Sequence, residues 1–113
     1  MKIEMLNPLP VGRVPFALSA YIKVPKIAGC YILTAYNNDV LYIGLATNLN
    51  DRFKQHLDNV EKINPTAEGK AIWFHFSTFD LMNLPKLERT WLNQFLNVHG
   101  RLPILNKKNS PIS

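Results

Sequence analysis

The stretch that decides the fold is GCYILTAYNNDVLYIG, residues 29–44. Two apolar runs in it, 30–36 and 40–43, flank the triplet Asn37-Asn38-Asp39. Asn and Asp tolerate a positive φ and hydrogen-bond to their own backbone, so this pattern predicts a β-hairpin. We expect its strands at about 29–36 and 40–44.

The composition is typical of one packed domain that prefers a polyanionic partner. The chain has 113 residues, of which 47% are hydrophobic, a formal charge of +5 and a pI near 9.5. This length supports one hydrophobic core but not two. The moderate positive charge favours nucleic acid as a partner.

The cysteine and histidine content predicts a reducing location and no zinc site. Cys30 is the only cysteine, and no secretory signal is visible at the N-terminus, so an intracellular protein is expected. His56, His75 and His99 are scattered. No uncharged stretch is long enough to span a bilayer, so no membrane association is expected.

Prolines break the first 28 residues, which we interpret as an N-terminal arm packed over the edge of the sheet. Residues 16–24 (FALSAYIKV) fit either a short strand or a helical turn. The domain proper is expected at 29–113, with a C-terminal tail after Gly100.

Two helices and a further strand follow the hairpin. A helix at about 48–62, capped by Thr47 or Asn48, has an apolar stripe at helical spacing: Leu49, Phe53, Leu57 and Val60. The segment KAIWFHFSTF, 70–79, is typical of a strand. A second helix at about 84–98 begins near Pro85 and ends near Gly100.

The predicted fold is therefore α+β: a small, three-stranded, mainly antiparallel sheet packed with helices in the order β-β-α-β-α. A sheet covered by helices is the economical way to bury both helix stripes.

Glu88 interrupts the apolar face of the second helix, which is otherwise formed by Leu84, Leu87, Trp91, Leu92 and Phe95. An ionised carboxylate costs several kcal/mol to bury without a partner. Glu88 therefore requires an arginine, a metal ion or an opening to solvent. From this helix alone, a glutamate at the edge of the face with its carboxylate in water is the simpler interpretation.

Arg52 and His56 share one side of the first helix, and the two hairpin tyrosines are the groups they would face. If the hairpin loop has an even number of residues, Tyr31 and Tyr42 point to the same face of the sheet. They would then lie four residues apart along the ladder, roughly 13 Å. An odd loop would separate them, and each would be an ordinary strand aromatic with its hydroxyl in water.

Together these residues resemble a known pattern. Gly29-Cys30-Tyr31, ten intervening residues and Tyr42-Ile43-Gly44 are followed by Arg52, His56, Glu88 and Asn106. This order, over roughly residues 28–107, is similar to that of the GIY-YIG nuclease domain.

The resemblance implies a role for each matched residue. Tyr31 and Tyr42 correspond to the paired active-site tyrosines, and Arg52 to the arginine that contacts the scissile phosphate. Glu88 resembles the carboxylate that is usually the only protein ligand of one divalent ion, here expected to be Mg²⁺ with Mn²⁺ as a substitute. Asn106 resembles the asparagine that supports the site from the tail.

The spacing of Arg52 and His56 resembles restriction-enzyme-like members of the family. Cys30 replaces the isoleucine of the first motif, which is a conservative change. Leu45 follows the second motif where several members, including excision-repair nucleases, have lysine, and this disfavours the excision-repair branch.

The resemblance implies a metal-dependent endonuclease that cuts duplex or branched DNA by in-line attack of water. An arginine suits the phosphate because its fork is permanently charged and matches phosphate oxygens. Tyr31, backed by His56, is our expected general base. Further phosphate contacts are expected from the basic residues Lys54, Lys62, Lys107 and Lys108. The alternative is a module of the same fold that binds nucleic acid with little or no turnover.

Overall fold

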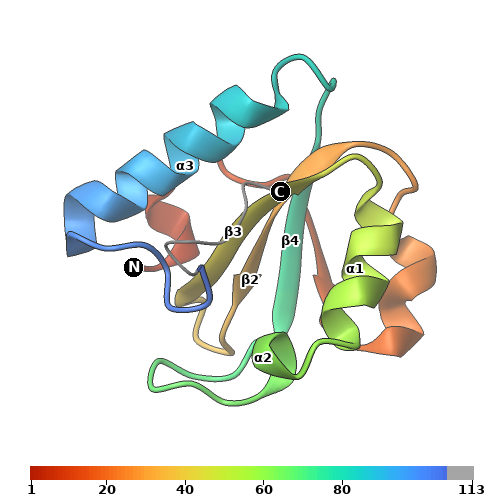
Figure 1. Cartoon of the computed structure of the whole chain (residues 1–113), viewed down its shortest axis with the longest axis horizontal. Helices are drawn as coiled ribbons and strands as arrows, with labels where there is room; N and C mark the ends of the chain where they lie inside the picture. The colour runs from red at the N-terminus through yellow and green to blue at the C-terminus, as the bar shows by residue number, and fades with distance from the viewer. Residues whose placement is uncertain (107–113) are drawn as a thin grey trace.

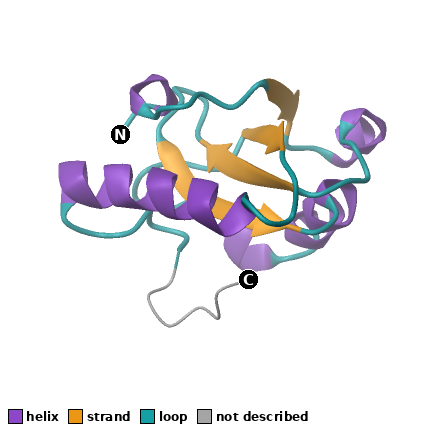
Figure 2. Cartoon of the chain, turned by 90° about the horizontal axis from the view of Figure 1, so that it is seen from above, coloured by secondary structure: helices purple, strands orange, loops and turns teal. Residues whose placement is uncertain are grey.

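The computed structural model describes residues 1–106 and contains a four-stranded antiparallel sheet between two helical layers (Figures 1 and 2). The strands are β1 (Gly12–Pro15), β2 (Gly29–Thr34), β3 (Val40–Ala46) and β4 (Trp73–Thr78). Their order across the sheet is β1-β4-β2-β3, so the hairpin occupies one side of the sheet. The α+β class is confirmed.

The prediction of three strands was wrong, because the N-terminal arm supplies a fourth. β1 pairs with β4, and the flanking bonds from Val11 N to Phe76 O and from Phe16 N to Ile72 O are 3.1 and 2.7 Å long. Proline has no N–H to donate, but at an edge strand one side of the backbone needs no partner. Pro15 is therefore compatible with β1. The prolines of the arm limit this strand to four residues without preventing it.

Elsewhere the arm forms two short 3-10 helices, η1 (Ile3–Met5) and η2 (Leu18–Lys23). The second settles the open alternative for residues 16–24 in favour of helix. Asn7-Pro8 is a cis peptide.

The helix predicted at 48–62 is two helices, α1 (Leu49–Leu57) and α2 (Val60–Ile63). Asn48 caps α1 by accepting from the Asp51 N–H at 3.1 Å. Asn59 caps α2 by accepting from the Glu61 N–H at 2.9 Å, so the chain turns between the two helices. This turn takes Val60 out of the predicted apolar stripe and leaves it 62% exposed.

The core has two parts, one on each face of the sheet. Tyr31, Leu33, Phe53 and Phe74 belong to the part under α1 and η2. The other part lies under α3 (Leu84–His99) and includes Ile32, Ile43, Trp91 and Phe95. β2 is buried on both faces, which places its tyrosine deep inside the domain.

The second predicted helix agrees closely with α3. Pro85 lies in its first turn, and Gly100 ends it in the left-handed conformation with φ of 70°. After α3 the chain folds back, and the Leu105 N–H donates to Leu41 O on the outer edge of β3 at 2.9 Å. Within residues 1–106, no helix is both long enough and apolar enough to cross a membrane.

Candidate active site

The two hairpin tyrosines lie side by side on the α1 face of the sheet. Tyr31 pairs with Gly44 and Leu33 with Tyr42, so the tyrosines are two residues apart along the ladder rather than four. Their rings stack with centroids 5.8 Å apart, and the predicted spacing of four residues along the ladder was wrong. The register explains the error, because the sequence fixes neither the length of the turn nor the bulge at Leu33 and Thr34.

Gly44 makes this stacking possible. A Cβ at position 44 would lie 2.7 Å from the Tyr31 hydroxyl oxygen and 2.8 Å from the Tyr42 ring. Gly29 has a similar role beneath α1, where a Cβ would lie 2.5 Å from both Leu49 Cδ1 and Ser77 O. The two motif glycines thus allow the tyrosines and α1 to approach the sheet backbone.

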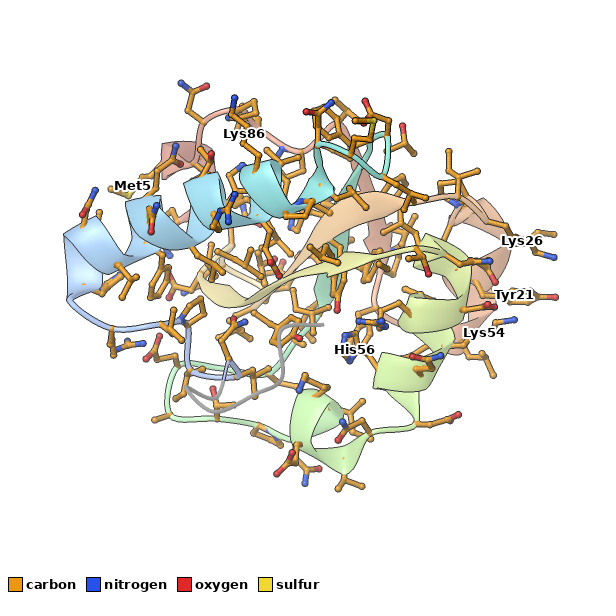
Figure 3. All side chains as sticks on the ribbon, turned by 45° about the horizontal axis from the view of Figure 1, so that its top comes forward. Met5, Tyr21, Lys26, Lys54, His56 and Lys86 are labelled. Carbon is orange, nitrogen blue, oxygen red and sulfur yellow. The ribbon has the colours of Figure 1, made fainter. Side chains whose placement is uncertain are left out.

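His56 projects from α1 toward the sheet (Figure 3). Its ring contacts both tyrosines. Its Nε2 lies 2.6 Å from the Tyr31 hydroxyl, and the two share a buried hydrogen bond. Burial, with the charges of Lys62 and Arg52, lowers the pKa of His56 from 6.5 to about 3. The imidazole is therefore neutral at physiological pH and retains one ring nitrogen as an acceptor.

Arg52 lies one helical turn before His56 and is half-buried. Its Nη1 donates to Leu45 O at 3.2 Å, which holds the side chain against the end of β3. Within residues 1–106 it forms no ion pair with a carboxylate. A guanidinium at this position can donate hydrogen bonds to the oxygens of an incoming phosphate.

Burial raises the pKa of both tyrosines, but to different degrees. The pKa of Tyr31 lies well above its ordinary value, mainly because the side chain is inaccessible to water. Burial also raises the pKa of Tyr42, while the Tyr31 hydroxyl and Arg52 act to lower it and Glu88 adds to the rise. Both phenols are therefore protonated in the free protein.

Lys62 reaches the site from α2. Its side chain is buried, and its Nζ lies 4.7 Å from the centroid of the Tyr42 ring. This is a cation–π contact in a water-poor setting. The sequence predicts Lys62 as a phosphate contact but not its packing against Tyr42, because this packing depends on the turn that separates α2 from α1.

Asn106 holds the backbone of β3 between the second tyrosine and Gly44. Its Oδ1 accepts from the Ile43 N–H at 2.9 Å, and its Nδ2 donates to Ile43 O at 2.8 Å. The side chain thus occupies the place of a neighbouring strand along the outer edge of β3 and fixes the strand that carries Tyr42.

Glu88 lies on α3 and approaches the site across β3. The residue is only 8% exposed, so most of the side chain is buried rather than in water as the helix alone suggested. Burial raises the pKa of its carboxyl, while Arg89 acts to lower it. Within the described part of the chain the carboxylate has no ion pair, and its charge reaches Tyr42 and Cys30.

A family model described as the GIY-YIG catalytic domain matches residues 27–101. The chain belongs to the GIY-YIG catalytic domain family. The match covers the hairpin, the helices α1, α2 and α3, and β4. Membership in the family implies nuclease-type activity in general. No protein of curated function matches the chain significantly.

The residues of this GIY-YIG domain fit a magnesium ion held by one carboxylate. No group of three or more His, Cys, Asp or Glu side chains comes together within residues 1–106. Mg²⁺ keeps several waters and commonly takes one or two carboxylates together with substrate phosphates. Glu88, buried and without an ion pair in the described residues, has the chemistry of such a ligand.

The predicted site residues of the domain therefore separate into two groups. The structure brings Tyr31, Tyr42, Arg52 and His56 together on the α1 face of the sheet. Asn106 lies along the outer edge of β3, and Glu88 lies on α3, which covers the opposite face. Lys54 instead faces the Tyr21 ring, while Lys107 and Lys108 lie outside the described residues.

Proposed function

We propose that this protein is a metal-dependent endonuclease that hydrolyses phosphodiester bonds in DNA by in-line attack of water. The observation that carries the proposal is the buried hydrogen bond between Tyr31 and His56, beside an arginine without a carboxylate partner in the described residues. A phenol is a weak base unless its own proton has an acceptor. His56 is that acceptor.

In the proposed step the Tyr31 hydroxyl gives its proton to His56 Nε2 and takes one from the attacking water, which requires the bound DNA to open the buried hydroxyl to that water. In the tautomer that carries its proton on Nδ1, the imidazole accepts from the Tyr31 hydroxyl at the observed 2.6 Å. A histidine with a pKa of about 3 is a weak acceptor in the free protein. A DNA phosphate at Arg52 adds negative charge near the imidazole, which raises its pKa and favours the transfer.

One observation favours Tyr42 as the base instead. Tyr31 is fully buried, whereas Tyr42 retains 7% exposure, and Arg52 and the Tyr31 hydroxyl act to lower its pKa. In that arrangement Tyr31 and His56 would orient Tyr42 through hydrogen bonding and ring contacts. We place the base at Tyr31 because its hydroxyl lies 2.6 Å from His56 Nε2, which can accept its proton, and substitution of each tyrosine distinguishes the two roles.

Glu88 is the proposed ligand for the metal ion. When bound there, Mg²⁺ or Mn²⁺ supplies charge neutralisation to the leaving oxygen. Arg52 binds a non-bridging phosphate oxygen, and Asn106 fixes the strand that carries Tyr42. The contact of Tyr31 with His56 supports placement among the restriction-enzyme-like members, which share the Arg-x-x-x-His spacing.

A plasmid-nicking assay tests the proposal. The protein should convert supercoiled DNA to nicked or linear forms with Mg²⁺ and should do so no longer with EDTA. Glu88→Gln serves as the control for a contaminating nuclease, because a contaminant would cut equally in both preparations. DNA binding without any cleavage would favour the alternative, a nucleic-acid-binding module of the same fold.

A further inference from the structure

A basic and aromatic surface lies beside the active site and has no part in the chemistry proposed above. We call it the η2 surface and define it by four residues, Tyr21, Lys23, Lys26 and Lys54. Figure 3 shows Tyr21, Lys26 and Lys54 gathered at one end of the molecule, next to α1 and away from Lys86. Three of the four come from the arm, so the arm does more than extend the sheet.

The part of the arm that forms this surface carries positive charges and no negative ones. Residues 5–38 contain Arg13, Lys23 and Lys26 but no aspartate or glutamate. Lys23 and Lys26 are exposed, and among residues 1–106 neither forms an ion pair. Asp51 is the one acidic residue of α1. Local excess charge of this kind attracts a polyanion.

An aromatic ring lies within this positive charge. Tyr21 is 43% exposed, and the Lys54 Nζ lies 5.6 Å from the centroid of its ring. Lysines bind the phosphates of a duplex, and an exposed tyrosine hydroxyl can hydrogen-bond to the same backbone. We favour DNA over an acidic protein as the partner because the surface adjoins the helix that carries the proposed nuclease site.

The η2 surface is fixed to the helix that carries the active site. Asn50, which is 1% exposed, donates from Nδ2 to Tyr21 O at 2.7 Å and to Val24 O at 2.9 Å. The Asn50 N–H also donates to Pro25 O at 3.1 Å, and the Leu49 N–H donates to Ile27 O at 2.9 Å. These four bonds join the arm to the first turn of α1.

We propose that the η2 surface binds the DNA backbone that flanks the cleavage site. The proposal rests on the function proposed above. Arg52 and Lys54 lie on different sides of α1, so the surface is about one helix diameter, on the order of 10 Å, from the site. That length of duplex carries about six phosphates, so one bound duplex reaches both.

Salt-dependent binding of a duplex to the full chain, in EDTA, tests the surface. The Lys23→Ala/Lys26→Ala double variant should bind more weakly, and its slope of log K against log salt should be smaller by about 1.8, because each lost phosphate contact removes about 0.9. Tyr21→Ala should weaken binding several-fold with little change in slope. Lys86→Ala is the matched control, an exposed lysine on α3 that should leave the slope within about 0.3 of wild type.

The inference is overturned if the double variant has the same slope as the wild type, or if Lys86→Ala reduces the slope as much per residue. It is also overturned if the variants bind DNA normally and lose binding only to an acidic protein. Cleavage by the wild type with Mg²⁺ is measured separately. If the wild type cleaves DNA but the double variant has an unchanged slope, only the η2 surface is rejected. If the double variant has a reduced slope but the wild type does not cleave, the proposed function is rejected and the η2 surface stands.

Discussion

The Tyr31 hydroxyl and His56 Nε2 are 2.6 Å apart, although 24 residues separate the two in the chain, and both side chains are buried. The bond joins β2 to α1 on the face of the sheet that α1 covers. A polar pair at this depth is costly to break, because each partner would be left without its hydrogen bond.

We expect substitution of this pair to remove most of the activity. Tyr31→Phe should lower the single-turnover cleavage rate by about 10³-fold and His56→Ala by about 10²-fold, the range for general base catalysis. Tyr42→Phe should retain more activity than either. The double variant Tyr31→Phe/His56→Ala should be little worse than Tyr31→Phe, because residues that act as a unit are not additive. If Tyr42→Phe is the most impaired, the roles of the tyrosines are exchanged.

Stability should fall with acid because of two buried histidines. Burial lowers the pKa of His56 from 6.5 to about 3 and that of His75 from 6.5 to about 4. Below pH 6.5 the unfolded chain therefore binds protons that the folded chain does not, and stability falls with pH until the folded values are reached. With both histidines contributing, the slope should approach about 2.7 kcal/mol per pH unit near pH 5.

Urea unfolding at several pH values measures this slope. His75→Gln retains a group that can hydrogen-bond to Thr34 and should reduce the slope by about 1.4 kcal/mol per pH unit, the value for one proton. His99→Gln is the control, because His99 is exposed. An equal slope in His75→Gln and wild type would show that His75 does not carry this dependence.

Glu88→Gln should abolish Mg²⁺-dependent cleavage while DNA affinity changes less than about threefold. Because burial raises the pKa of this carboxyl, its contribution to stability is lost as pH rises above its unfolded value of 4.5. The glutamine variant should therefore be at least as stable as wild type at pH 8. Thermal unfolding with and without Mg²⁺ completes the test, since added Mg²⁺ should stabilise only the wild type. Cleavage at the wild-type rate would exclude Glu88 as the ligand.

Arg52→Lys retains the positive charge but loses the two-pronged guanidinium. We expect the cleavage rate at saturating DNA to fall by 10²-fold or more, with little change in binding. The comparison is between single-turnover rate and affinity for the same duplex. Parallel losses in both would mean that Arg52 only positions the backbone.

Asn106→Ala removes both hydrogen bonds to Ile43 and should cost about 1–3 kcal/mol of stability. Cleavage should fall as well, because β3 and its tyrosine lose a support on their outer edge. Asn93→Ala is the matched control, since Asn93 is exposed on α3. Similar stability of the two variants in urea would count against this role of Asn106.

Local patterns in the sequence predicted the hairpin, α3 and the candidate site residues. Asn37-Asn38-Asp39 predicts the turn, and Asn38 does adopt a positive φ of 72°. Pro85 and Gly100 mark the ends of α3 through backbone restrictions that act within a few residues. The order of tyrosines, arginine, histidine and glutamate can likewise be read from the sequence alone.

Only the tertiary structure decided which of these groups meet. The stacking of Tyr31 on Tyr42 depends on the register of the hairpin and on the space left by Gly44. The burial of Glu88 depends on the packing of α3 against β3, and the position of Lys62 on the turn before α2. β1 and the attachment of η2 through Asn50 join segments distant in the chain. Such contacts gain their free energy from burial and pairing across the fold, which propensity and spacing along one segment do not encode.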